Sequence, residues 1–203
     1  DAANEMAPLA GIFHMAVALA DDQFVNMDEA KFKRVTDSKL GVLEVIERLV
    51  DVSSLDFLML FSSTAALYFN PGQANYNAAQ AYFNRMAKDH RNIISIAVPA
   101  ITDVGVFAQL VEAKGKTAAT KSMLALACSS RELCMRIRDA LSRTVTNQPV
   151  PYYIPGNLDW TVSYKIAESC RTSFSHLAEH DDDDEVDEDD EEEDDDDDKD
   201  SDD

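Results

Sequence analysis

The chain has 203 residues, of which 45% are hydrophobic, and this is enough for one domain with a hydrophobic core. The formal net charge of −21 is concentrated in residues 181–203, which hold 20 acidic residues and one lysine, so residues 1–180 hold 19 acidic and 17 basic residues. This nearly neutral part has no basic excess for nucleic acid, and no apolar run reaches the roughly 18 residues that span a membrane.

The three cysteines, Cys128, Cys134 and Cys170, are an odd number and lack the spacing of a metal site. They favour a reduced, cytoplasmic protein without a bound metal. The chain has no charged-then-apolar leader and begins with Asp1, so we expect it to be processed or cut from a longer protein.

Strands and helices alternate along the chain. Short apolar runs predict strands, and the first of them is almost wholly apolar, as expected for a strand buried on both faces. The predicted strands are Gly11–Leu19, Leu55–Ser63, Asn92–Ile101 and Val150–Ile154. Helical spacing of apolar residues predicts helices over 28–50, from Asn75 or Tyr76 onward, and over Thr117–Leu126 and Ser130–Thr144. This alternation predicts an α/β fold with a parallel sheet.

No Gly-rich turn of the dinucleotide-binding type occurs in the sequence, although such folds begin with a strand, that turn and a helix that holds a pyrophosphate. Either the chain is another kind of α/β protein, or the first half of its fold lies upstream of Asp1. The predicted architecture is therefore a partial doubly wound, Rossmann-like sheet.

Three polar residues are expected at one rim of this sheet. Ser63 ends a predicted strand, Tyr76 begins the next helix, and Lys39 lies in the preceding crossover helix. Ligands of open α/β sheets bind at the carboxyl ends of the strands. A nearby ammonium group lowers the pKa of a phenol, which can then give a proton to a carbonyl oxygen while a serine hydroxyl orients that oxygen. Together they suggest a site for carbonyl reduction.

Residues 60–86, "LFSSTAALYFNPGQANYNAAQAYFNRM", resemble the ketoreductase domain of polyketide synthases, a branch of the short-chain dehydrogenase/reductase superfamily. Residues 35–49, "VTDSKLGVLEVIERL", resemble the helix that carries the family's lysine, at Lys39. Residues 11–27, "GIFHMAVALADDQFVNM", resemble the strand and loop before it. The resemblance covers roughly residues 10–105 and is closer to fungal than to bacterial members.

The resemblance implies the carboxyl-terminal part of a ketoreductase domain over residues 1–165, followed by a linker over 166–180 and a disordered acidic tail over 181–203. It implies NADPH-dependent reduction of a β-ketoacyl thioester held on an acyl carrier protein, with other polyketide synthase domains as partners. The implied catalytic residues are Lys39, Ser63, Tyr76 and Gln80. The implied cofactor-binding residues are Tyr76, Lys39, Pro99 and Val104. Because the Gly-rich turn is absent, we expect the chain by itself not to bind NADPH tightly and not to be active.

The sequence departs from the family pattern at two positions, because Gln80 replaces an asparagine and Val17 replaces a glycine. A catalytically silent structural or interaction subdomain is therefore an alternative function. His14, on an apolar strand, is interpreted as a core histidine with its hydrogen bonds satisfied rather than as a base or ligand.

The acidic tail is interpreted as a disordered spacer, with an electrostatic arm for a basic partner or a loose Ca²⁺ sink as the alternative.

Overall fold

The computed structural model describes residues 7–68, 70–115, 117, 120, 123–124, 127–146 and 152–153. The predicted linker and acidic tail lie outside these residues. Within them the chain forms a four-stranded parallel sheet in the order β1-β2-β3-β4, which confirms the predicted α/β fold. The strands are β1 (Gly11–His14), β2 (Phe57–Ser63), β3 (Ile93–Val98) and β4 (Tyr152–Tyr153).

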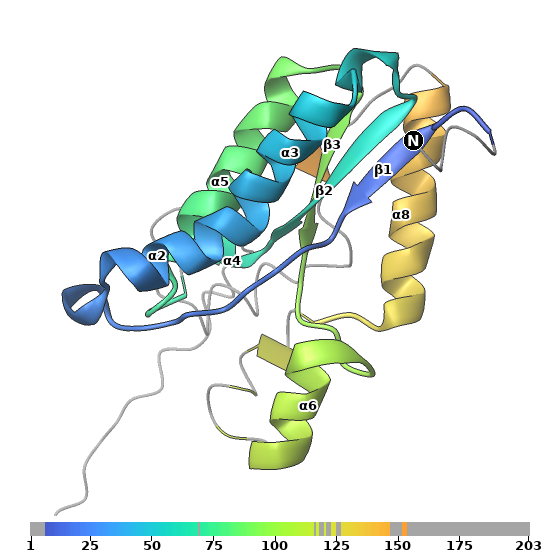
Figure 1. Cartoon of the computed structure of the whole chain (residues 1–203). Helices are drawn as coiled ribbons and strands as arrows, with labels where there is room; N and C mark the ends of the chain where they lie inside the picture. Colours follow the sequence, from blue (N-terminus) through green and yellow to red (C-terminus); the bar gives the residue numbers. More distant parts are fainter. Residues whose placement is uncertain are drawn as a thin grey trace, which may run out of the picture.

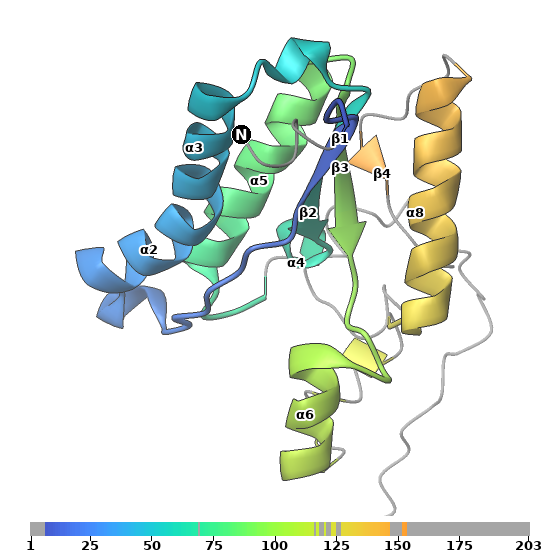
Figure 2. The same ribbon diagram turned by 45° about the vertical axis from the view of Figure 1, so that its right-hand side comes forward.

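Helices cover both faces of the sheet (Figures 1 and 2). On one face lie α2 (Glu29–Thr36), α3 (Val42–Leu49) and α5 (Ala74–Asp89), and on the other lies α8 (Ser130–Val145). The shorter elements are η1 (Phe24–Asn26), η2 (Asp37–Gly41), η3 (Val52–Ser54), α4 (Ala65–Tyr68) and α6 (Gly105–Lys114). Because β2 and β3 alternate their side chains between the faces, the chain has two apolar clusters, one under α3 and α5 and one under α8.

The helix predicted over 28–50 exists, but a turn of π-helix interrupts it. Asp28 caps its start by accepting a hydrogen bond of 2.8 Å from the backbone N–H of Lys31. The helix then widens over η2 before continuing as α3. A π turn inside a helix marks functional positions more often than chance, and this one contains Lys39.

The first predicted strand is wrong in length and in burial. β1 ends at His14, and the side chains of Phe13 and Met15 are 45% and 61% exposed instead of buried on both faces. The reason is its position, because β1 is the edge strand of the described sheet and the described part of α8 packs against β2 and β3. On the side away from α3 and α5, the ring of Phe13 is therefore left partly exposed.

The carboxyl-terminal elements agree in part with the prediction. The sequence predicted a helix over Ser130–Thr144, and α8 is found there. It begins at a capping box formed by Ser129 and Glu132. The helix predicted over Thr117–Leu126 falls mostly outside the described residues. α6 was not predicted. It begins at Gly105 and is followed by Gly115, and both glycines have a positive φ, of 80° and 70°.

Candidate functional site

The carboxyl ends of three parallel strands meet at one edge of the sheet. β1 ends at His14, β2 at Ser63 and β3 at Val98, and the register pairs Ser63 with Val98. The Ser63 hydroxyl accepts a hydrogen bond of 3.1 Å from the backbone N–H of Ala65. The Ser63 hydroxyl also hydrogen-bonds Tyr76, so these two side chains lie together at this edge.

Tyr76 lies in the first turn of α5, and Asn75 holds it there. The fully buried Asn75 side chain accepts a hydrogen bond of 2.8 Å from the backbone N–H of Tyr76. Its amide group donates to the carbonyl oxygens of Ala20, at 3.0 Å, and Lys31, at 3.2 Å. Asn75 thus ties the start of α5 to the loop after β1 and to α2.

The loop after β1 is further attached to the turn before α5. The backbone N–H of Asp22 donates to the carbonyl oxygen of Gly72 at 2.9 Å, and Gly72 has a φ of 81° that favours glycine. The Gln73 amide donates to Asp21 at 2.8 Å. Pro71 and Gly72 thus form a turn before α5 whose backbone is bonded to the neighbouring loop.

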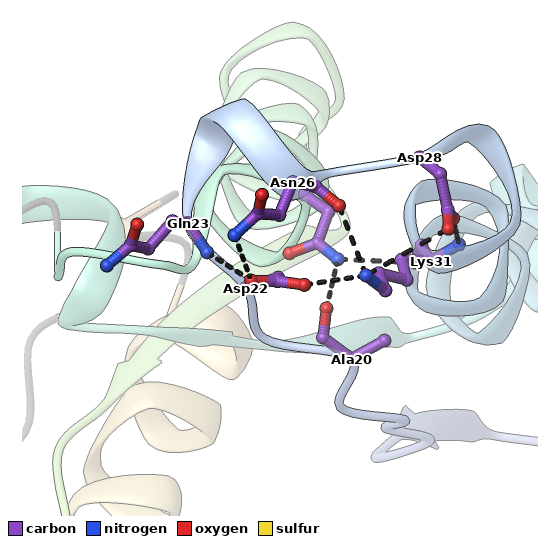
Figure 3. Close-up of polar contacts among 7 residues, drawn as sticks. Ala20, Asp22, Gln23, Asn26, Asp28 and Lys31 are labelled. Carbon is purple, nitrogen blue, oxygen red and sulfur yellow. Dashed lines mark hydrogen bonds and ion pairs between the residues drawn. The ribbon is translucent and has the colours of Figure 1, made fainter.

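An ion pair closes the same loop (Figure 3). Lys31 Nζ lies 2.6 Å from an Asp22 carboxylate oxygen and also donates to the carbonyl oxygen of Asn26 at 3.1 Å. The hydrogen bond from Lys31 lowers the pKa of Asp22, and Asp22 in turn raises the pKa of Lys31. Sequence reasoning missed this ion pair because residues nine apart do not face each other in regular structure.

Lys39 is buried in the π turn, where only 2% of the residue is exposed. Its Nζ donates a hydrogen bond of 2.9 Å to the carbonyl oxygen of Phe61. It also lies 5.0 Å from the ring centre of Phe83 and 5.9 Å from that of Tyr76. Burial lowers the pKa of Lys39 to about 8, because the charged ammonium loses most of its water.

The pKa of Tyr76 is raised, which contradicts the lowering expected from a neighbouring ammonium. Burial of the phenol is the largest cause, and Asp21 adds to it, whereas hydrogen bonding with Ser63 and Gln80 acts in the opposite direction. Lys39 Nζ approaches the ring of Tyr76, but its hydrogen bond goes to the Phe61 carbonyl oxygen. In this conformation Tyr76 is a protonated hydrogen-bond donor at neutral pH.

Gln80 lies one turn after Tyr76 and is fully buried. Neither polar atom of its side chain makes a hydrogen bond of normal geometry with the described residues, although the amide is near enough to Tyr76 to affect its pKa. The Ser62 hydroxyl donates to the backbone oxygen of Gln80 at 3.4 Å. Asn77 Oδ1 is also buried without a partner among the described residues. Such groups are costly and therefore rare.

The other expected residues lie near the same edge. Pro99 directly follows β3 and is buried, whereas Val104 precedes α6 and is 53% exposed. Val17, in the segment after β1, is 50% exposed.

His14 is buried, and its Nε2 lies 2.8 Å from the carbonyl oxygen of Lys39. The interpretation of His14 as a satisfied core histidine is therefore confirmed.

Within the described part of the chain, no three histidine, cysteine or acidic side chains gather as metal ligands. None of the described helices has the length and apolar composition needed to cross a bilayer. The cysteines that are described, Cys128 and Cys134, are free, and the first of them is buried.

Known proteins resemble the chain in sequence. Over 175 residues it is 28% identical to the highly reducing polyketide synthase stpks1 of Strobilurus tenacellus, a match that covers 86% of this chain and 6% of that protein. Over 111 residues it is 32% identical to tenellin synthetase of Beauveria bassiana, covering 53% of this chain and 3% of that protein. The chain therefore spans only a small part of these relatives, which are fungal as the sequence indicated.

Solved structures share the fold. An A-type ketoreductase from a modular polyketide synthase superposes with a TM-score of 0.66 at 21% identity, covering 81% of this chain and 34% of that one. The first ketoreductase of the tylosin polyketide synthase gives 0.63 at 22% identity, covering 83% and 36%.

The family model for the KR domain matches residues 1–103, which is half of the chain and includes β1, β2, β3 and the helices between them. Lys39, Ser63, Tyr76 and Gln80 all lie within the matched residues. The chain belongs to the KR domain family, the ketoreductase domains of polyketide synthases.

Proposed function

We propose that this chain is part of an NADPH-dependent reductase that converts a β-ketoacyl thioester to a β-hydroxyacyl thioester within a polyketide synthase. The observation that carries the proposal is the arrangement of Ser63, Tyr76 and Lys39 around one edge of the sheet. Tyr76 is linked to Ser63 through hydrogen bonding and lies beside the Lys39 ammonium. A hydroxyl donor, an acid and a cation at one site suit a carbonyl oxygen that gains negative charge.

The described residues fit the nicotinamide ring, the part of the cofactor that carries the hydride. The site combines the buried, unpartnered amide of Gln80 with apolar residues at the carboxyl edge, where dinucleotides bind in related sheets. Pro99 and Val104 are the residues that would line this end. When bound, the cofactor supplies the hydride, and the protein contributes orientation and electrostatics.

The side chains would divide the work as follows. The Ser63 hydroxyl donates a hydrogen bond to the substrate carbonyl oxygen and so fixes its position. Tyr76 donates its phenolic proton to the same oxygen, since burial keeps the phenol protonated. Lys39 is mostly protonated at pH 7, because its pKa is about 8, and its charge stabilises the phenolate that remains. Gln80 supports the return of a proton to Tyr76.

The substrate and partners are those of the assembly that contains the chain. The matched relatives are polyketide synthases of which the chain covers 6% or less. We therefore propose that an acyl carrier protein presents the substrate and that other synthase domains flank this piece.

Replacing Tyr76 with phenylalanine in a synthase that contains the chain tests the proposal. Tyr76→Phe should lower reduction of a β-ketoacyl thioester at least about 100-fold, because general acid catalysis contributes 10²–10⁴-fold, while leaving NADPH binding nearly unchanged. Tyr82→Phe is the matched control, since Tyr82 lies on the same helix and is 46% exposed. Unchanged turnover of Tyr76→Phe would remove Tyr76 from the mechanism.

A catalytically silent subdomain is the second candidate function. The observation that favours it is Gln80, whose amide has no hydrogen bond of normal geometry within the described part of the chain, at a position where the family has an asparagine. For such a subdomain, Tyr76→Phe would leave turnover of the synthase unchanged and alter only its stability.

A further inference from the structure

The helix that carries Lys39 is widened at that residue. α2 and α3 have regular α-helical turns, whereas the five residues Asp37–Gly41 form a turn of π-helix between them. A π turn displaces carbonyl groups from the regular hydrogen-bond pattern and leaves them open to other donors. The Lys39 carbonyl oxygen is one of these, since it accepts from the Val42 N–H three residues later.

His14 supplies a second donor to that carbonyl group. Its Nε2 lies 2.8 Å from the Lys39 oxygen, and the two residues are 25 positions apart in the chain. A carbonyl oxygen can only accept, so the proton of the imidazole lies on Nε2. Burial is the largest cause that lowers the pKa of His14, and the ring is therefore neutral at pH 7.

The same two residues share a third partner. The His14 ring packs edge-on against Phe83, with 5.1 Å between the ring centres. Lys39 Nζ lies 5.0 Å from the centre of that Phe83 ring. His14 thus hydrogen-bonds the backbone of Lys39 and packs on Phe83, the aromatic residue over which the Lys39 side chain lies. All three residues are buried.

We propose that His14 is a positioning residue for Lys39, which stabilises the π turn from the end of β1 and so directs the lysine ammonium toward Tyr76 and the Phe61 carbonyl oxygen. Lys39 Nζ also donates to the Phe61 carbonyl oxygen, and the Ser38 hydroxyl accepts from the Ala18 N–H, but these contacts involve side chains of the turn and do not fix its backbone in rotation. A hydrogen bond from a rigid ring does so, because it requires one direction of the carbonyl group.

This inference rests on the role proposed above for Lys39, and its test needs no turnover. Lys39 lies over Phe83, so ring currents should shift its ε-methylene protons upfield from those of other lysines in an NMR spectrum of the full chain. His14→Leu removes the donor and should abolish most of that shift. His14→Gln can place an Nε2 donor near the same carbonyl and should restore it.

His90→Leu is the control, because His90 is exposed at the end of α5 and should leave the Lys39 signals unchanged. A folded His14→Leu variant with the Lys39 shift of the unaltered chain would overturn the proposal. If this variant does not fold, the imidazole nitrogen shifts of the unaltered chain decide, since a proton on Nδ1 instead of Nε2 at pH 7 also overturns it. Failure of Tyr76→Phe to affect reduction would count against the proposed function and leave these signals as expected.

Discussion

The two faces of the sheet differ in what they bury. The face under α3 and α5 combines an apolar cluster around Leu60 and Phe83 with buried polar groups, among them His14, Lys39 and Gln80. The face under α8 is apolar and ends at the exposed ring of Phe13. The first face therefore holds the candidate site, whereas the second face leaves apolar surface exposed where β1 is the edge strand.

The largest expected effect is the loss of Phe83, which joins the apolar cluster of the first face to the site. Phe83→Ala should lower the free energy of unfolding by about 3–5 kcal/mol, because a fully buried aromatic side chain leaves a cavity. Denaturant titration measures this change. Tyr82→Ala, at the exposed neighbour, should cost less than about 1 kcal/mol. Similar losses in both variants would mean that this face is not closely packed.

Periodicity predicted the elements of the first face correctly, because β2, β3 and α5 each bury one continuous pattern of apolar residues. It could not predict the π turn at Lys39, since the apolar spacing from Val35 to Val42 fits one continuous helix and the donor that favours the turn, His14, lies on another element. The exposure of Phe13 was missed for a related reason. An apolar strand has the same sequence whether or not a neighbour covers it.

The site residues Lys39, Ser63 and Tyr76 were predicted from their places at one rim of the sheet and from a resemblance, and the structure brings them to one edge. The contacts that hold them, such as those of Asn75 with Ala20 and Lys31, join distant parts of the chain and have no sequence pattern of their own. α6 was not predicted, and it begins at Gly105, a residue type that is unfavourable in helices.

The second prediction concerns the buried charge of the first face. The pKa of Lys39 is about 8 in the folded chain and 10.5 ordinarily. Below pH 8 both states bind the proton, and the folded state bears the full cost of burying the charge. Between pH 8 and 10.5 only the unfolded state keeps the proton, so the contribution of Lys39 to stability rises with pH.

Lys39→Met should therefore raise the free energy of unfolding at pH 7 by roughly 1–3 kcal/mol. Each ten-fold change in proton affinity corresponds to about 1.4 kcal/mol, and loss of the hydrogen bond to Phe61 reduces the gain. The gain should shrink as the pH rises to 10.5, and Lys33→Met, at an exposed position of α2, is the control for removing a lysine. Denaturant titrations at several pH values measure both. A gain that does not depend on pH would contradict the assignment of a lowered pKa to Lys39.

The third prediction concerns Gln80, the other polar group buried on this face. Gln80→Leu should raise the free energy of unfolding by about 1–2 kcal/mol, because the apolar side chain removes two buried polar atoms that make no hydrogen bond of normal geometry with the residues that the structure describes. Gln80→Asn keeps a buried amide and should show no such gain, and within an active synthase it should preserve or raise turnover. Destabilisation by Gln80→Leu would show that an internal water already satisfies the amide.

The smallest effect on stability is expected at the edge of the second face. The ring centre of Phe13 lies 5.0 Å from that of Phe57 and 6.4 Å from that of Phe61, yet 45% of Phe13 remains exposed. An exposed apolar edge strand promotes association between copies of a chain. Phe13→Thr should therefore cost less than about 1 kcal/mol of stability and clearly reduce self-association in analytical ultracentrifugation.

The adjacent Ile12 provides the matched control for this edge. It belongs to the same strand, but its side chain packs against the cluster that contains Leu58 and Phe83. Ile12→Thr should thus cost more stability than Phe13→Thr and leave self-association as strong as before, because the exposed ring remains. If both variants reduced association equally, the backbone edge of β1 rather than the apolar side chain would drive it. The two residues differ because Ile12 packs into the cluster under α3 and α5, whereas Phe13 contacts Phe57 and Phe61 and remains 45% exposed. Figure 2 shows α3 and α5 on one side of the sheet and α8 on the other.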